Sequence, residues 1–242
     1  NMKVFENKIV VLTGASSGIG YSLLNYFVKE GARVYGSSRN ERELTTESKQ
    51  ECNFELLDLA DELNVEKYVK TILQKENRID ILINNAGVAH NLALVEEIDS
   101  KMLNSVVRDN LLPTFNMMKY TIPIMKKNNS GTIINISSRA GRRAVPKLSA
   151  YTAAKFAVRG LTESVAKEVQ DTGIKCISIS PAGVNTGMRA MVFGQEDAEN
   201  QQDTSRINEV ISKILSGSLD VSNGSDIVII KGKEPIIRVP EI

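Results

Sequence analysis

Short apolar runs alternate along the chain with longer stretches in which apolar residues recur every three or four positions. A continuous apolar run is typical of a strand buried on both faces, and the wider spacing is typical of a helix that packs on a core. Strands are predicted over residues 9–13, 33–37, 54–57, 79–83, 132–136, 174–179 and 227–230. The alternation predicts a doubly wound parallel sheet of about seven strands with helices on both faces, joined by right-handed crossovers.

The same spacing predicts four helices, over residues 19–28, 65–73, about 100–126 and 150–169. Pro113 and Pro123 should bend the third helix or mark its ends, because proline cannot donate a helical hydrogen bond. Residues 188–204 are polar and acidic without a clear period, so we expect an irregular loop that is functional or mobile. The apolar tail at 235–242 should pack on a partner subunit or on its own chain.

The composition supports a single folded domain over residues 1–242. Hydrophobic residues make up 42% of the chain, enough for a large core and too many for a disordered protein. Lys plus Arg (30) nearly balance Asp plus Glu (29), and the net charge of +1 predicts no nucleic-acid partner and no anionic membrane surface. No apolar run reaches the roughly 18 residues that cross a bilayer, and no secretory leader is visible, so we expect a cytoplasmic protein.

Three isolated residues offer little chemistry. Cys52 and Cys176 lie far apart without a paired spacing, so we expect neither a disulfide framework nor a metal site. His90 could serve as a base, but a structural role is favoured because a tyrosine described below fills that function.

Glycines follow the first predicted strand in the segment TGASSGIG, residues 13–20. Such a loop lets a diphosphate approach backbone N–H groups at the positive end of a helix. Three glycines alone could form a tight turn, but here they lie between a predicted strand and a predicted helix, as a dinucleotide site requires. The spacing is G-x-x-x-G-x-G rather than the common G-x-G-x-x-G.

Further motifs follow in order: NNAG at 84–87, Ser137 and Ser138 after the fifth strand, and Tyr151-x-x-x-Lys155 in the next helix. Over roughly residues 5–190 the chain resembles the classical short-chain dehydrogenase/reductases, and among them the 3-oxoacyl-carrier-protein reductases. The resemblance implies a single-domain Rossmann fold and hydride transfer between a nicotinamide cofactor and a carbonyl or secondary alcohol. It also implies a homodimer or homotetramer in which the two long helices pair across subunits.

The second predicted strand ends in Ser38-Arg39, where NAD-preferring members carry an acidic residue. Arg39 can bind a 2′-phosphate, so we predict NADP(H) as the cofactor. In the alternative, Arg39 is a solvated surface residue and the protein is an NAD-dependent alcohol dehydrogenase. By resemblance, Asp58 would read the adenine amino group. After the sixth strand, Ala182 departs from the Pro-Gly usual in the family. The resemblance assigns cofactor contacts to Gly14, Ser16, Ser17, Gly18, Ile19, Gly20, Ser38, Arg39, Asp58, Leu59, Asn85, Ala86, Gly87, Tyr151, Lys155, Pro181, Ala182, Val184 and Thr186.

Tyr151 and Lys155 are four residues apart, so on a helix they share one face. An ammonium beside a phenol stabilises the phenolate, which suits the phenol to proton transfer near neutral pH. By resemblance, Tyr151 is the proton donor or acceptor and Lys155 also holds the nicotinamide ribose. Ser138, thirteen residues before Tyr151, would donate to the substrate oxygen, and Asn110 would hold a water of a proton relay.

The substrate is not identified by the sequence. Arg139, Arg142 and Arg143 could attract an acidic substrate or carrier protein, or they could lie in a solvated loop. Met188 and Met191 could line an adaptable apolar pocket. The leading hypothesis is a ketone reductase acting on a free or carrier-bound substrate; the alternative from another class is a non-catalytic dinucleotide-binding or sensing protein.

Overall fold

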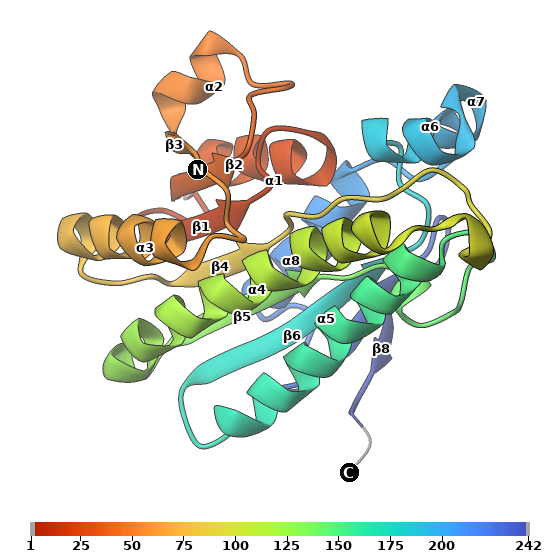
Figure 1. The fold of residues 1–242 in the computed structure, drawn as a ribbon. Helices are drawn as coiled ribbons and strands as arrows, with labels where there is room; N and C mark the ends of the chain where they lie inside the picture. Colours follow the sequence, from red (N-terminus) through yellow and green to blue (C-terminus); the bar gives the residue numbers. More distant parts are fainter. Residues whose placement is uncertain (1–2, 241–242) are drawn as a thin grey trace.

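The structure is a computed structural model that describes residues 3–240, so residues 241 and 242 of the apolar tail lie outside the described part (Figure 1). One sheet runs through it in the order β3-β2-β1-β4-β5-β6-β7-β8. Neighbouring strands are parallel from β3 to β7, and β8 pairs antiparallel with β7. The strands are β1 (Ile9–Thr13), β2 (Arg33–Ser38), β3 (Asn53–Leu56), β4 (Ile81–Asn84), β5 (Gly131–Ile136), β6 (Ile174–Pro181), β7 (Asp226–Ile229) and β8 (Ile236–Arg238).

Helices cover both faces of this sheet, which confirms the predicted doubly wound α/β fold. The helices are α1 (Gly18–Lys29), α2 (Thr46–Glu51), α3 (Glu62–Glu76), α4 (Ser100–Asn128), α5 (Ser149–Glu168), α6 (Gly187–Phe193), α7 (Gln195–Glu199) and α8 (Ser205–Leu215). Short 3-10 turns, η1 (Val95–Glu97) and η2 (Arg139–Gly141), precede α4 and α5.

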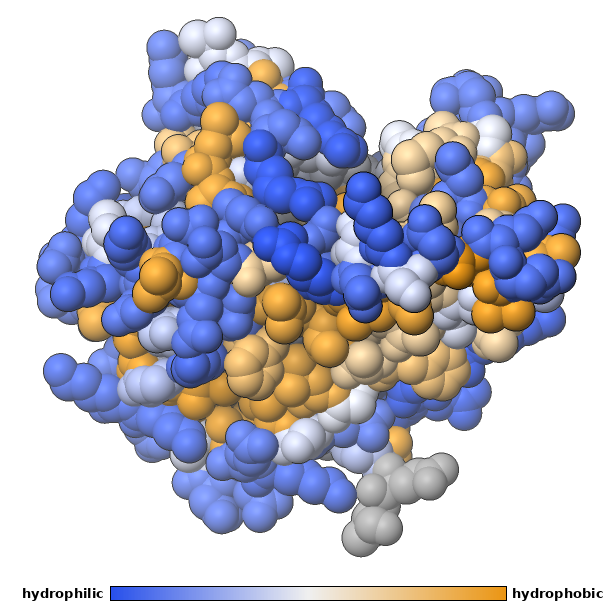
Figure 2. All heavy atoms as spheres, in the orientation of Figure 1, coloured by the Kyte–Doolittle hydropathy of each residue, from blue (hydrophilic) through white to orange (hydrophobic). Residues whose placement is uncertain are grey.

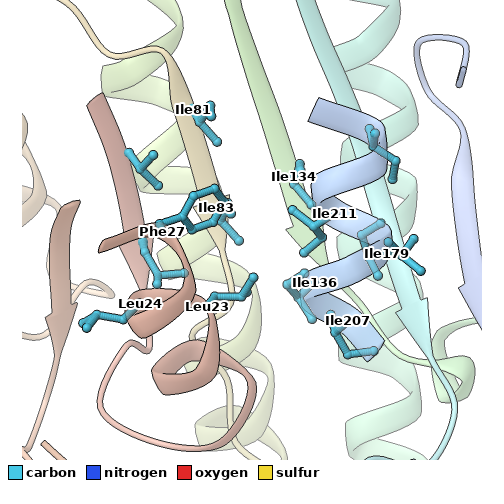
Figure 3. Packing of buried hydrophobic residues seen from close by; sticks show 14 of the residues in the cluster. Leu23, Leu24, Phe27, Ile81, Ile83, Ile134, Ile136, Ile179, Ile207 and Ile211 are labelled. Carbon is cyan, nitrogen blue, oxygen red and sulfur yellow. The ribbon is translucent and has the colours of Figure 1, made fainter. Parts of the chain in front are cut away.

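Alternate residues of each strand enter two separate cores. In β1, Val10 and Leu12 join the core under α1 and α8, whereas Ile9 and Val11 join the core under α3, α4 and α5. Figure 3 shows Phe27 of α1 and Ile211 of α8 beside the strand isoleucines of the first core. Because both faces are covered, the inner strands are mostly apolar, with a few buried polar residues such as Asn135 and Ser180, and the apolar runs allow the strands to be predicted from the sequence.

One expectation about the elements was wrong, and one of two alternatives for the prolines is excluded. Residues 188–204 are not an irregular loop, because α6 and α7 occupy most of the segment and the Thr186 hydroxyl caps α6 by accepting the Arg189 N–H at 3.2 Å. Pro113 and Pro123 do not end a helix, since α4 runs through both. Each proline removes one helical hydrogen bond, a loss that a long packed helix tolerates.

Besides α6 and α7, three further elements were missed. α2 is short and polar, and β8 has three residues, so neither carries a clear period. α8 had a readable signal, with Ile207, Val210, Ile211 and Ile214 at helical spacing, and all four are buried. β8 makes the sheet eight-stranded rather than seven-stranded and places residues 236–238 of the tail on this chain's own β7.

Candidate active site

The sheet changes winding direction between β1 and β4, and the strand ends there form the floor of the site. Gly14 adopts a φ of +63°, and a Cβ at that position would lie 2.8 Å from the Ala86 Cα. The Thr13 hydroxyl accepts the backbone N–H groups of Asn85 and Ala86, both at 3.0 Å. The glycine loop and the NNAG segment therefore lock together at the edge where open α/β sheets bind ligands.

A groove of about 380 Å³ runs along this edge. The notch at the top of Figure 2 opens between the segment that carries α2 and the pair α6 and α7. The groove is lined by these residues expected to contact the cofactor: Gly14, Ser16, Ser17, Gly18, Ile19, Ser38, Arg39, Asp58, Leu59, Asn85, Ala86, Gly87 and Thr186. Gly20 lies beneath the loop, where an added Cβ would be 2.0 Å from the Gly14 carbonyl oxygen.

Two residues expected to select the cofactor already have partners within the chain. Arg39 Nη1 lies 2.7 Å from Asp109 Oδ2, and the Ser38 hydroxyl donates to the Asn40 carbonyl. Asp58 accepts Arg108 Nη2 at 2.6 Å and the Ala60 N–H at 3.0 Å. Burial raises the pKa of Asp58, but the hydrogen bonds from Arg108 and Ala60 outweigh it, so the pKa is lowered and the carboxyl group stays ionised.

A second cavity of about 510 Å³ adjoins the groove and shares Ile19, Thr186 and Met188 with it. Ser138 and Tyr151 line this cavity. Its other lining residues expected from the motifs are Pro181, Ala182 and Val184. The Ser137 hydroxyl donates to the Lys155 carbonyl at 3.0 Å and so braces α5, which leaves Ser138 as the serine hydroxyl beside Tyr151.

Burial raises the pKa of Tyr151, and a hydrogen bond with Ser138 opposes this. Lys155 Nζ lies 5.7 Å from the centre of the Tyr151 ring and donates to the Ile136 carbonyl at 3.0 Å. Burial lowers the pKa of Lys155 to about 8. The ammonium is therefore held in a dry position behind the phenol, where its charge acts at high strength.

Asn110 completes the cluster from α4. Its Nδ2 donates to the Val88 and Val106 carbonyls, both at 2.8 Å, while Oδ1 is buried without a partner among the residues described. A Cβ added to Gly87 would lie 2.6 Å from Asn110 Oδ1 and 3.3 Å from Lys155 Nζ, so these groups converge on one small space. An acceptor without a partner next to a buried cation suits a water or a ribose hydroxyl.

The remaining candidates lie elsewhere. His90 is 5% exposed and its Nδ1 lies 2.7 Å from the Asn91 carbonyl oxygen; it lines neither cavity, in keeping with a structural role. Arg142 forms an ion pair with the buried Asp226, whereas Arg139 and Arg143 line the second cavity. Met188 lines both cavities and Met191 neither. No group of His, Cys, Asp or Glu that could hold a metal ion occurs within residues 3–240, and no helix in that range could span a membrane.

Sequence reasoning missed three charged residues of the groove, Arg42, Glu43 and Asp109. Asp109 immediately precedes Asn110 in the sequence, and this position could have marked it as a site residue. Its contact with Arg39, however, depends on the fold. Glu43 lies in a loop without a motif, and nothing in the sequence places it on the glycine loop.

Comparisons with known proteins agree with this geometry. A family model for short chain dehydrogenases matches residues 8–197. An NADPH-dependent pterin aldehyde reductase of Arabidopsis thaliana is 30% identical over 223 residues, which are 90% of this chain and 92% of that protein. The chain belongs to the short-chain dehydrogenase family, and it is an NAD(P)-dependent oxidoreductase of that family.

Solved structures show the same architecture. The structure of ElxO with NADP bound has a TM-score of 0.82 at 28% identity and covers 92% of this chain and 97% of that one. A 3-ketoacyl-(acyl-carrier-protein) reductase from Brucella melitensis, complexed with NADH, has a TM-score of 0.86 and covers 94% of this chain and 98% of that one. Its 24% identity shows the shared fold alone.

The buried ammonium gives a stability prediction. Below about pH 8 Lys155 is protonated in both the folded and unfolded states, and its burial cost is fully present. Between pH 8 and the ordinary pKa of 10.5 the unfolded chain binds a proton that the folded chain does not, so wild-type stability rises with pH. We expect Lys155→Met to raise the unfolding free energy of the protein without ligands at pH 7 by up to about 3 kcal/mol, and so to raise its melting temperature.

This gain should shrink steadily as the pH is raised from 8 to 10.5, measured by calorimetry. Lys70→Met on the exposed surface of α3 is the matched control and should change little at any pH. A lower melting temperature for Lys155→Met at pH 7 would contradict the assigned burial cost.

Proposed function

We propose that the chain is an NADP(H)-dependent carbonyl reductase in which Tyr151 gives a proton to the substrate oxygen. The observation that supports this most is that Ser138 and Tyr151 line the second cavity together, with the Lys155 ammonium 5.7 Å from the centre of the Tyr151 ring. A dinucleotide fits the groove, and a ketone fits the second cavity with its oxygen toward the two hydroxyls. The groove residues lie on strand ends and a helix N-terminus, where anionic ligands bind.

Each residue has a part in this reaction. NADP(H), when bound, supplies or accepts the hydride. The Ser138 and Tyr151 hydroxyls donate hydrogen bonds to the substrate oxygen, which stabilises negative charge as it develops there. The proton of Tyr151 then passes to that oxygen, and the nearby Lys155 ammonium favours the phenolate that remains. Asn110 Oδ1 would hold a water behind Lys155, through which the phenolate is reprotonated.

Tyr151→Phe tests this assignment. The variant keeps the ring and removes the hydroxyl, so turnover should fall by at least a hundredfold while the dissociation constant for NADPH stays within a few-fold of wild type. Turnover is followed by NADPH absorbance and binding by calorimetry. Undiminished turnover would contradict the role of Tyr151, whereas nucleotide binding without turnover in the wild type would favour the non-catalytic alternative.

We expect Arg39 to determine which cofactor is preferred, and the preferred cofactor in turn indicates the direction of the reaction. Its guanidinium lines the groove at the end of β2, where a carboxylate would repel a 2′-phosphate. Arg39→Asp should move the preference toward NAD(H). If the wild type already preferred NADH, the alternative of NAD-dependent alcohol oxidation would be favoured.

The second cavity also indicates a substrate class. Its ionised lining residues are Arg139, Arg143, Arg189 and Lys231, and no carboxylate of residues 3–240 lines it. Arg189 pairs with Asp197 at 2.5 Å, while Arg139 and Arg143 make no ion pair with a described residue. The wall between them is apolar and includes Val145 and Val192. We infer a ketone with an apolar body and an anionic end, either as a free acid or as part of a carrier.

A matched substrate series tests this inference. Oxo acids of increasing chain length, beginning with 4-oxopentanoate, are compared with their methyl esters. We expect the acids to have the lower KM, and Arg139→Gln and Arg143→Gln to raise the KM of the acids roughly fivefold with little effect on the esters. Lys147→Gln, in the same loop but outside the cavity, is the control. A preference for the esters would contradict an anionic substrate.

We further propose that α4 and α5 form a subunit interface, as the family resemblance implies. Leu103, Leu112 and Phe115 of α4 and Phe156 of α5 are 38–46% exposed, and Figure 2 shows an apolar surface over these two helices. Helix α6 would cover the substrate, since its residues Met188, Val192 and Phe193 line the cavity. The free thiols of Cys52 and Cys176 support a cytoplasmic location.

Sedimentation tests the interface. The wild type should sediment as a dimer or tetramer, and Phe115→Asp should give monomers because it buries a charge without a partner. Leu63→Asp, on α3 and 65% exposed, places the same charge outside this face and should leave the assembly intact. A monomeric wild type at micromolar concentration would contradict the proposal.

A further inference from the structure

The charge balance of the nucleotide groove is unusual for a site that takes an anionic ligand. Its cationic lining residues are Arg39 and Arg42, and its acidic ones are Glu43, Asp58 and Asp109. A dinucleotide carries a negative diphosphate, and NADP(H) a further phosphate dianion. Asp58 has an expected role toward adenine, but Glu43 and Asp109 have none in the proposed function.

Asp109 holds the arginine that was expected to select NADP(H). Its carboxylate is 10% exposed and accepts Arg39 Nη1 and Arg108 Nη1, each at 2.7 Å. Arg108 continues to Asp58 at 2.6 Å, so a row of alternating charges joins the loop after β2, helix α4 and the loop after β3. A mostly buried carboxylate is screened less by salt than a surface one, so Asp109 competes with any other anion that approaches Arg39.

Glu43 binds a backbone N–H of the glycine loop, as Asp109 binds Arg39. Both of its carboxylate oxygens accept the Gly18 N–H, at 3.2 and 3.3 Å, and Gly18 is the first residue of α1. The backbone N–H of Glu43 donates to the Ser16 carbonyl at 2.9 Å, which holds the residue against the loop. A helix N-terminus with open N–H groups is an anion site, and here a carboxylate of the chain itself is the anion.

We propose that Asp109 and Glu43 are internal competitors of the cofactor and set its affinity and the preference for the 2′-phosphate. This inference rests on the proposed function. A 2′-phosphate that binds Arg39 must displace or lie beside the Asp109 carboxylate, whereas a nucleotide without that phosphate does not meet it. Any dinucleotide that binds the Gly18 N–H must displace the Glu43 carboxylate, so breaking this contact weakens the binding of NADP(H) and NAD(H) alike.

The two carboxylates therefore have different signatures. Removing the charge of Asp109 should favour 2′-phosphorylated nucleotides selectively, and removing that of Glu43 should favour all anionic nucleotides that reach the loop. Asp109→Asn and Glu43→Gln keep the shape of each side chain. Glu41→Gln is the matched control, because Glu41 lies in the same loop, pairs with Lys49 and does not line the groove.

The test measures dissociation constants by calorimetry for adenosine 2′,5′-bisphosphate, AMP, NADPH and NADH, so it does not depend on turnover. We expect Asp109→Asn to tighten adenosine 2′,5′-bisphosphate and NADPH at least fivefold, with AMP and NADH changed by less than twofold. Glu43→Gln should tighten NADPH and NADH about threefold each, and Glu41→Gln neither. The Asp109→Asn gain should shrink in an Arg39→Gln background.

Weaker or unchanged binding of adenosine 2′,5′-bisphosphate to Asp109→Asn would overturn the role of Asp109, since it would mean that the carboxylate holds Arg39 in place for the phosphate. Unchanged NADPH and NADH binding to Glu43→Gln would overturn the role of Glu43. The melting temperature of each variant shows that it is folded, and the two variants test the proposal independently. Nucleotide binding as expected with no turnover of any ketone would contradict the proposed function instead.

Discussion

The burial of one ammonium group, that of Lys155, is the constraint on which the site depends. A parallel sheet brings the carboxyl ends of its strands to one edge. Helix α5 places Lys155 at the end of β5, where its Nζ donates a hydrogen bond to the Ile136 carbonyl. Burial disfavours the charged form and lowers the pKa of Lys155 to about 8. The folded state would therefore be more stable with an apolar residue at this position. The cost is consistent with function, since a cation out of water acts more strongly on the neighbouring Tyr151 phenol than a solvated one.

The sequence predicts most of this arrangement because the sheet is buried on both faces. Strands such as 132–136 are mostly apolar, and the motifs that carry the chemistry follow those strands at the edge where ligands bind. The sequence does not show contacts between distant segments. The pairing of Arg39 with Asp109 joins residues 70 positions apart, and the Glu43 contact with Gly18 depends on how the loop after β2 folds back. Helices α6 and α7 were missed because both are short and α7 is polar, so neither shows a helical period.

Electrostatics divides the site into two parts of opposite character. The groove contains three carboxylates and two arginines, while the second cavity has cations but no carboxylate among its described lining residues. In the groove Arg39 is already paired with Asp109, whereas Arg139 and Arg143 of the cavity have no ion pair with a described residue, so the proposed anionic substrate would meet cations without partners. This distribution suits a cofactor that must exchange at each turnover and a substrate that must be selected among many carbonyl compounds.

We propose that the carboxyl edge of the sheet binds a nicotinamide dinucleotide and prefers NADP(H). The most direct measurement is the melting temperature with NADPH, NADP, NADH and NAD, each at millimolar concentration. A ligand at about 100 times its dissociation constant stabilises a protein by roughly 2.7 kcal/mol, which is several degrees at this size. We predict a shift of that order with NADPH and NADP and a smaller one with NADH and NAD. The absence of a shift with all four nucleotides would contradict dinucleotide binding at this edge.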